Sequence, residues 1–510
     1  VVNYKSTFTY FNTTVIHSRH QSRINKIDRK EKYTVIDYLE EPITIYQDCK
    51  MSQLPKQFYW GGSVSSFQTE GAWNEGGKGL SIYDVRPTPE GHADWKVAID
   101  EYHRYKEDIA LMKQMHFNFY RFSIAWSRII PNGDDEINEE GVDFYNRLID
   151  ELIANGITPM ITLVHFDMPY KLVKEYNGFA SRHVVDLFER YARVCMERFG
   201  DRVKHWMSFN EQNLHSMRLI YSNAEVVPEG VSEPAFLYQV AHNVMIAHCK
   251  AVKALRELVP DAKFGGMTTI TSYYPATTTP QNNLFVQKAN NLMNMWVTHV
   301  HAKGSYPSYY IQYLKERGWF PHFEEGDEEL LKNTCDYLCF SYYRSNTLTE
   351  GEFDMTTPFA EIVEKHVVKN PHLEATEWGW EKDAKGLRYV MNDLYERYDM
   401  PIFILENGMG ARESLDENGE INDDYRIKYH REHIEEMKKA ILEDGVECLG
   451  YITWGPIDIP SSSCEVAKRY GFVYVNRTDS ELLDLRRIPK KSFYWIAQVF
   501  GSNGENLNNN

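Results

Sequence analysis

The sequence predicts an α/β protein that folds as one closed (β/α)8 barrel, a TIM barrel in a single domain. After residue 51, short apolar or β-branched runs alternate with amphipathic helical patterns. Eight such runs occur, which is the number of strands that closes this parallel barrel. A doubly wound open sheet is the competing fold, but no G-x-G-x-x-G motif opens a helix after the first run.

The eight runs are the predicted strands, in chain order around the barrel. They are residues 58–62, 118–122, 159–164, 205–209, 263–267, 336–341, 401–405 and 448–453. Helical patterns fill the intervals between them, and 142–156 and 184–200 are two clear examples. The second pattern ends at Gly200, the residue type that most often follows a helix.

The chain divides into three predicted segments. Residues 1–50 are polar, show no clear period and carry eight Lys or Arg against six Asp or Glu. We expect them to be an N-terminal leader or extension outside the core, with an extra surface element as the alternative. Residues 51–500 form the barrel domain, and residues 501–510, rich in Asn and Gly, are predicted to be a flexible tail.

Composition and charge exclude several classes of protein. The chain is 43% hydrophobic, which is too much for a disordered protein, yet no apolar run reaches the roughly 18 residues of a membrane helix. The net charge of -17 argues against nucleic acid as a partner. Of seven cysteines only Cys335 and Cys339 lie close together, so we expect reduced thiols in a cytoplasmic protein and no metal site.

Polar and aromatic residues follow most of the predicted strands, at the end of the barrel where active sites form. These residues are Gln68, Arg121, His165, Asn210, Glu211, Tyr343, Glu406 and Trp454. A single histidine or tryptophan at a strand end is more often structural than functional. The concentration of all of them at one end of the barrel indicates a site.

The two carboxylates define the expected chemistry. Glu211 follows the fourth strand and Glu406 the seventh, on opposite sides of the barrel mouth, and cleavage of a glycosidic bond requires such a pair. Their separation distinguishes retention from inversion of configuration, and the sequence does not give that distance. We expect Arg121 to keep Glu406 ionised, with a hydrogen bond from Tyr343. The charge of Glu406 should then raise the pKa of Glu211.

The other residues suit the binding of a sugar. Gln68, His165 and Asn210 are neutral donors and acceptors for hydroxyl groups. Trp380 and Trp454 offer flat apolar faces for sugar rings.

Five motifs in order resemble the signatures of family 1 glycoside hydrolases. They are "WGGSVSSFQTEGAW", "YRFSIAWSRI", "TLVHFDMP", "FNEQN" and "FILENGMG". The resemblance runs from about Leu54 to about Val499, and it implies a (β/α)8 barrel and a retaining mechanism without metal or cofactor. By this resemblance Glu406 matches the nucleophile and Glu211 the acid/base.

The same resemblance assigns the supporting residues. Those matched to the catalytic pair are Arg121, Asn210 and Tyr343, and those matched to the non-reducing sugar are Gln68, His165 and Trp454. Two departures from the family pattern touch no catalytic group. Ser341 stands where the family commonly has Asn, and Gln212 stands where it usually has Ile or Pro.

A third departure concerns the substrate. Ordinary β-glucosidases of the family carry a Glu-Trp pair after the last strand, and Ser461 and Ser462 replace it here, with Lys468 and Tyr470 following. Removing the carboxylate and adding hydroxyls and an ammonium group builds an anion site. The pattern looks like the phosphate-binding signature of the 6-phospho-β-glycosidases of this family.

The spacing leaves the phosphate-binding serine open. Counting forward from Trp454 selects Ser461, whereas counting back from Lys468 selects Ser462, and Ser463 is a weaker third choice.

The resemblance favours a 6-phospho-β-glucosidase, because the 6-phospho-β-galactosidases keep a Trp where Ser462 stands. The expected substrates are phosphorylated cellobiose or aryl β-glucosides, cleaved through a covalent glycosyl-enzyme intermediate to glucose 6-phosphate and an alcohol or sugar. An ordinary β-glucosidase and a 6-phospho-β-galactosidase are the alternatives within the family. A catalytically inactive sugar-phosphate-binding protein is the alternative of another class. We expect no membrane partner and allow for a homo-oligomer.

Overall fold

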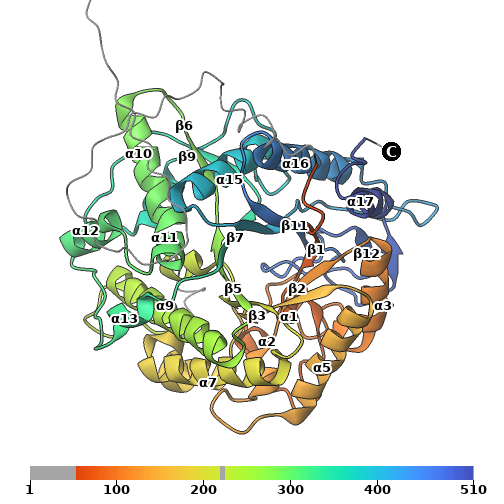
Figure 1. Cartoon of the computed structure of the whole chain (residues 1–510), viewed down its shortest axis with the longest axis horizontal. Coiled ribbons are helices and arrows are strands. Elements are labelled where there is room, and N and C mark those ends of the chain that lie inside the picture. The colour runs from red at the N-terminus through yellow and green to blue at the C-terminus, as the bar shows by residue number, and fades with distance from the viewer. Residues whose placement is uncertain (1–52, 219–223, 509–510) are drawn as a thin grey trace, which may run out of the picture. The chain divides into compact units, whose positions relative to one another are not determined.

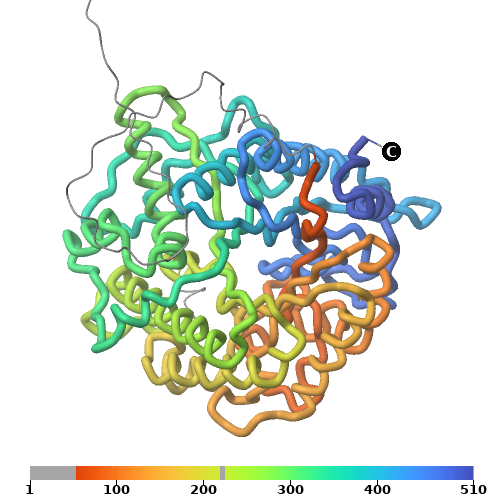
Figure 2. Tube along the Cα trace, viewed as in Figure 1, coloured from red at the N-terminus to blue at the C-terminus, as the bar shows by residue number. Residues whose placement is uncertain are grey.

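The computed structural model describes residues 53–218 and 224–508. The predicted leader at residues 1–50 therefore lies outside the described residues. In the described part, eight parallel strands close into a barrel, as predicted (Figure 1). Strand β1 pairs with β11, so the beginning and the end of the domain meet side by side and close the sheet (Figure 2).

The barrel strands begin and end within two residues of the predicted positions. They are β1 (Tyr59–Ser63), β2 (Phe119–Ser123), β3 (Thr158–Val164), β4 (His205–Phe209), β5 (Lys263–Thr269), β7 (Tyr337–Tyr342), β10 (Ile402–Asn407) and β11 (Cys448–Trp454). Two smaller sheets were not predicted. They are β6 (Ser272–Pro275) with β8 (Ser345–Leu348) and β9 (Val367–Val368), and β12 (Val473–Val475) with β13 (Arg487–Pro489).

Helices surround the barrel, and Figure 1 shows the longer ones outside the strands. The longer helices are α3 (Glu101–Gln114), α5 (Glu139–Ala154), α7 (Arg182–Phe199), α9 (Glu233–Leu258), α10 (Pro280–Asn290), α11 (Trp296–Lys303), α12 (Ser308–Arg317), α15 (Ala384–Tyr398), α16 (Asp424–Leu442) and α17 (Lys491–Gly501). The short ones are α1 (Ser66–Thr69), α2 (Ile82–Val85), α4 (Trp126–Ile129), α6 (Tyr170–Tyr176), η2 (Gly178–Ala180), η3 (Gln212–Ser216), η4 (Asn291–Met295), α13 (Asp327–Leu331) and α14 (Phe359–Lys365). None of the helices that the structure describes has an apolar stretch long enough to cross a membrane.

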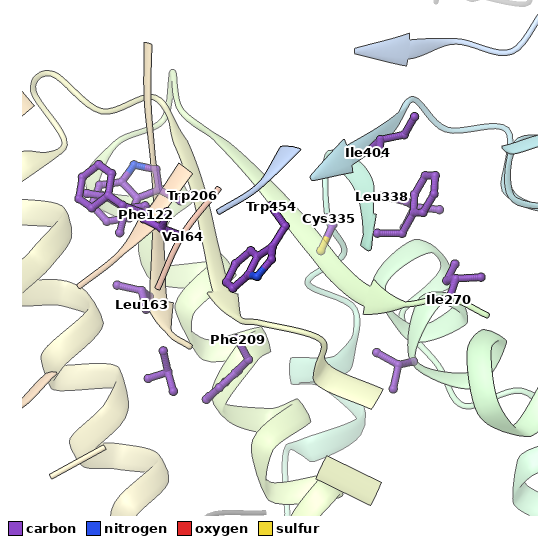
Figure 3. Packing of buried hydrophobic residues seen from close by; sticks show 14 of the residues in the cluster. Val64, Phe122, Leu163, Trp206, Phe209, Ile270, Cys335, Leu338, Ile404 and Trp454 are labelled. Atoms are coloured by element: carbon purple, nitrogen blue, oxygen red, sulfur yellow. The ribbon is translucent and has the colours of Figure 1, made fainter. Parts of the chain in front are cut away.

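The helical period explains why these segments pack against the barrel. In α5, Val142, Tyr145, Leu148 and Leu152 recur at intervals of three or four residues and are all buried. The chain then leaves the helix through Gly156, whose φ of +76° is costly for other residues. Such buried stripes form the layer between strands and helices, part of which Figure 3 shows.

The inside of the barrel is filled by a separate apolar cluster. Its members are Phe119, Met160, Met207, Met267, Tyr337, Cys339, Phe403, Leu405 and Ile452. They come from alternate positions of the strands, since successive side chains of a strand point to opposite faces. This cluster closes the barrel below its mouth, so the site above it has a packed floor.

The end of the chain differs from the predicted flexible tail. Helix α17 extends to Gly501, and the residues after it pack against the domain. The Leu507 carbonyl accepts hydrogen bonds from Arg431 Nε at 2.9 Å and from Trp495 Nε1 at 3.2 Å, and Leu507 itself is buried. Composition alone does not reveal these contacts, because the polar segment is held largely through its backbone.

Candidate active site

A cavity of about 550 Å³ opens at the carboxyl ends of the barrel strands. All of the predicted site residues line it except Arg121, which contacts Glu406. The predicted residues in the lining are Gln68, His165, Asn210, Glu211, Tyr343, Trp380, Glu406, Trp454, Ser461, Ser462, Lys468 and Tyr470. The structure therefore brings the whole predicted set together, and the role of each residue remains a prediction.

Strand β10 directs Glu406 into the cavity through a local irregularity. Phe403 and Leu405 point into the barrel, so strict alternation would turn Glu406 outward to the helices. The pairing of β10 with β7 shifts register between Ile404 and Glu406, as at a β-bulge. Because a bulge adds one residue to a strand, it re-aims the side chains that follow. Glu406 thereby faces inward despite its position in the alternation.

Glu406 is buried and held at both carboxylate oxygens. Arg121 Nη1 donates to Oε1 at 2.5 Å and Tyr343 OH donates to Oε2 at 2.8 Å. Burial raises the pKa of Glu406, while Arg121 and Tyr343 act against this rise. Both contacts were expected from the sequence, whereas the burial of Glu406 was not. The two donors therefore offset only part of the rise in the pKa of Glu406 that burial causes.

Arg121 itself is fully buried and is organised by four further partners, one of which is the Met207 sulfur, 3.4 Å from Nη2. Its guanidinium donates to Ser63 Oγ at 2.8 Å, to Thr162 Oγ1 at 2.7 Å and to Asn210 Oδ1 at 2.7 Å. Because the Asn210 oxygen accepts from Arg121, its amide nitrogen is the group left to face the cavity. Arg121 thus fixes both Glu406 and the donor side of Asn210.

Glu211 occupies a strained turn directly after β4. Its φ of +38° lies in the left-handed region, which costs a non-glycine residue about 1–3 kcal/mol. The next two side chains anchor the turn: Gln212 Oε1 lies 2.9 Å from His301 Nε2, and Asn213 Nδ2 donates to the Thr269 carbonyl at 2.9 Å. These buried contacts hold the backbone of Glu211 in its unusual conformation.

The environment of Glu211 favours its protonated form. Its pKa is raised to about 7, mainly by burial and secondly by the charge of Glu406. From the sequence we expected the charge of Glu406 to raise this pKa, and in the structure burial is the larger cause. Hydrogen bonds from Ser341 and Thr269 act in the opposite direction, because they stabilise the carboxylate.

Gln68 and His165 also line the cavity, after β1 and β3 respectively. Gln68 Oε1 accepts from Ser65 Oγ at 2.6 Å and its Nε2 donates to the Pro460 carbonyl at 2.8 Å, so its amide is fixed in orientation. His165 lies 5.3 Å from Trp454 between ring centroids, and its Nδ1 has no partner among the described residues. Burial lowers the pKa of His165 well below its usual value, so the ring is neutral.

The loop after β11 forms the predicted phosphate end of the cavity. Lys468 is 7% exposed, and within residues 53–218 and 224–508 its ammonium group forms no ion pair. Its Nζ lies 4.0 Å from the centroid of Trp380 and 5.7 Å from that of Tyr470. Burial lowers the pKa of Lys468 to about 8, and the nearby charge of Glu465 acts against this shift without forming an ion pair with the ammonium group.

The three serines all reach the cavity, so the structure does not choose among them. Ser461 is buried, and its hydroxyl accepts a hydrogen bond from the Glu465 amide at 3.1 Å. Ser462 and Ser463 are exposed, and Ser463 Oγ lies 3.2 Å from Ser461 Oγ. The identity of the phosphate-binding serine remains a prediction.

Sequence reasoning missed three charged residues that line the cavity, namely Arg218, Arg344 and Glu364. Arg344 lines it, and its Cζ lies 5.2 Å from the centroid of Trp380. The only sequence signal is its place directly after the two tyrosines of the "SYYRS" segment. In the described parts of the chain, no group of three or more His, Cys, Asp or Glu side chains is placed to hold a metal ion.

Comparisons with known proteins show the family to which the chain belongs. The model of the family described as "Glycosyl hydrolase family 1" matches residues 50–505. An aryl-phospho-β-D-glucosidase of Bacillus subtilis is 45% identical over 467 residues, covering 89% of this chain and 99% of the relative. A phospho-cellobiase of Klebsiella oxytoca is 41% identical, covering 90% and 100%. The solved structure of a family 1 β-glucosidase from Thermotoga maritima matches with a TM-score of 0.79 and 32% identity, covering 89% and 99%.

Proposed function

Because the chain belongs to glycosyl hydrolase family 1 and is a glycosidase, we propose that it hydrolyses 6-phospho-β-D-glucosides with retention of configuration. The assignment of a phosphorylated substrate rests on one observation. Lys468, which forms no ion pair among the described residues, lies beside Tyr470 and the serines at the end of a cavity that also holds two carboxylates. Hydrolysis of an uncharged β-glucoside does not call for a buried cation without a direct ion pair in its cavity. The relatives are named as aryl-phospho-β-D-glucosidase and 6-phospho-β-glucosidase, and these names support the same assignment.

In the first step, the Glu406 carboxylate attacks the anomeric carbon and the bond to the leaving oxygen breaks. Glu211 donates its proton to that oxygen, so the alcohol leaves neutral and the sugar is esterified to Glu406. The pKa of Glu211, raised to about 7, keeps a large fraction of it protonated at neutral pH. Arg121 and Tyr343 position Glu406 for the attack.

In the second step, the Glu211 carboxylate takes a proton from water while the water oxygen attacks the anomeric carbon. The ester bond breaks, Glu406 leaves as a carboxylate, and Glu211 is protonated again. Two displacements at the same carbon restore the original β configuration. The net reaction consumes one water and releases the phosphorylated sugar and the alcohol.

The phosphate end supplies binding energy at a distance from the reacting bond. A phosphate group would give Lys468 a directly bonded anionic partner and would raise its pKa again. We also propose a cytoplasmic location, since the six cysteines of the described residues are buried free thiols.

The experiment that tests the substrate compares kcat/KM for 4-nitrophenyl β-glucoside with and without a 6-phosphate. We expect a strong preference for the phosphorylated compound. Lys468→Met should lower kcat/KM for it by an amount that corresponds to about 1.5–3 kcal/mol of lost transition-state stabilisation, the worth of a charged hydrogen bond. Lys382→Met is the matched control, since Lys382 pairs with Glu374 at 2.9 Å outside the cavity lining. A wild-type ratio near one would contradict the assignment, and a higher rate on the 6-phospho-β-galactoside would favour the galactosidase alternative.

The pH dependence of kcat/KM reports the state of Glu211 in the free enzyme. Because the protonated form is the active one and its pKa is about 7, activity should fall as the pH rises through this value. Ser341→Ala removes a hydrogen bond that favours the carboxylate, so it should raise the pKa of Glu211 and move the alkaline limb to higher pH. A limb that stays in place in Ser341→Ala would assign it to a different group.

A further inference from the structure

The small sheet of β6, β8 and β9 forms one wall of the cavity. Arg344 directly precedes β8 and Asn346 lies within it, and both line the cavity. The alternate residues, Ser345 and Thr347, are buried. This alternation is that of a strand with one face toward the cavity. Tyr273 on β6 is paired in register with Asn346 and also lines the cavity. We call Tyr273, Arg344 and Asn346 the outer wall.

Two polar side chains of the outer wall have no hydrogen-bond partner in the protein. In the described ranges 53–218 and 224–508, the Arg344 guanidinium makes no hydrogen bond or ion pair, and the Asn346 side-chain amide makes no hydrogen bond. Arg344 is held by its contact with the face of Trp380, with Cζ 5.2 Å from the ring centroid. The wall therefore presents the donors of a guanidinium and an amide to the cavity, next to a flat aromatic surface.

The topology places this wall on the side of the leaving group. Strands β6 and β8 continue β5 and β7, which carry Thr269 and Ser341, the two residues that hydrogen-bond Glu211. The leaving oxygen takes its proton from Glu211, so the leaving group extends from there. The phosphate end follows β11 instead, which is separated from β7 by β10 in the barrel. The outer wall and the phosphate end thus follow different strands, and they meet at Trp380, whose ring centroid lies 4.0 Å from Lys468 Nζ and 5.2 Å from Arg344 Cζ.

We propose that the outer wall selects a hydroxyl-rich leaving group, a second sugar, over a flat aryl group. This inference rests on the proposed function for the reaction, and it names the class of the leaving group. Arg344 and Asn346 would bond to hydroxyl groups of that sugar. An aryl group offers no such hydroxyl groups and leaves the two polar side chains unpaired. A site whose donors find partners only on the right ligand discriminates against ligands that lack the matching groups.

The test measures kcat/KM for cellobiose 6′-phosphate and for 4-nitrophenyl 6-phospho-β-glucoside, and takes their ratio for each enzyme. We expect the ratio of disaccharide to aryl substrate to fall at least tenfold in Arg344→Met and at least threefold in Asn346→Leu. Arg412→Met is the matched control and should keep the wild-type ratio. Arg412 stacks on Trp378 of the same loop, with Cζ 5.0 Å from the ring centroid, but lies outside the cavity lining.

Two outcomes would overturn the proposal. Equal loss on both substrates in Arg344→Met would make Arg344 a contact of the phosphorylated sugar, and no loss on either would leave it without a role in binding. If the wild type shows no preference for phosphate, the proposed function fails separately. The same ratio is then measured with cellobiose and 4-nitrophenyl β-glucoside. Neither of these substrates carries a phosphate, so their ratio still reports on the leaving group alone.

Discussion

Replacement of Glu406 with glutamine should abolish turnover, with kcat lowered on the order of 10⁴-fold or more, as for other covalent nucleophiles. The amide has nearly the same shape as the carboxylate but cannot form the ester with the anomeric carbon. It also leaves Arg121, which is fully buried, without its anionic partner at 2.5 Å. The variant should therefore lose stability as well as activity, and the two effects must be measured separately.

Glu413→Gln is the matched control for the loss of stability. Glu413 is a second buried carboxylate, paired with Arg426 and with Lys490 at 2.5 Å each, and it lies outside the cavity lining. Breaking a buried ion pair costs about 3–5 kcal/mol of folding free energy. We expect both variants to unfold at lower denaturant concentration, but only Glu406→Gln to lose kcat when assayed folded.

A chemical-rescue experiment tests whether Glu406 is the nucleophile or only supports the structure of the site. In Glu406→Gly, added azide should restore release of nitrophenol, because azide attacks the anomeric carbon in place of the missing carboxylate. The product should be a glycosyl azide of α configuration, since only one displacement occurs. A β product, or full turnover by Glu406→Gln, would remove Glu406 from the role of nucleophile.

The fold could be read from the sequence because its signals are local. Each barrel strand is a short apolar run, and helices such as α5 repeat buried residues every three or four positions. The small sheet of β6, β8 and β9 was missed for the opposite reason. Its strands have two to four residues, too few for a period, and they form only because β5 and β7 bring them together.

The members of the site were predictable, whereas their orientation was not. Alternation along β10 would have turned Glu406 away from the cavity, and the register shift that corrects this depends on pairing with β7. The left-handed turn at Glu211 depends on distant partners such as His301. Arg344 was missed because the sequence does not show that its guanidinium stacks on Trp380 and forms no hydrogen bond or ion pair among the described residues.

Replacement of Glu211 with glutamine should slow the reaction in a way that depends on the leaving group. A sugar alcohol leaves only with a proton, so kcat/KM for cellobiose 6′-phosphate should fall by about 10²–10⁴-fold, the usual worth of general acid catalysis. A dinitrophenolate leaves without a proton, so the first step on 2,4-dinitrophenyl 6-phospho-β-glucoside should change little. The second step still needs Glu211 as a base, and the covalent intermediate should accumulate.

Rapid mixing distinguishes these two steps. For the dinitrophenyl substrate we expect a burst of dinitrophenolate close to one per active site, followed by a slow steady rate. Azide should speed that steady rate, because an anionic nucleophile needs no base to reach the ester on Glu406. The alkaline limb of the pH profile should also disappear, since the group with a pKa of about 7 is gone. Equal slowing of the first step for both leaving groups would show that Glu211 is not the acid.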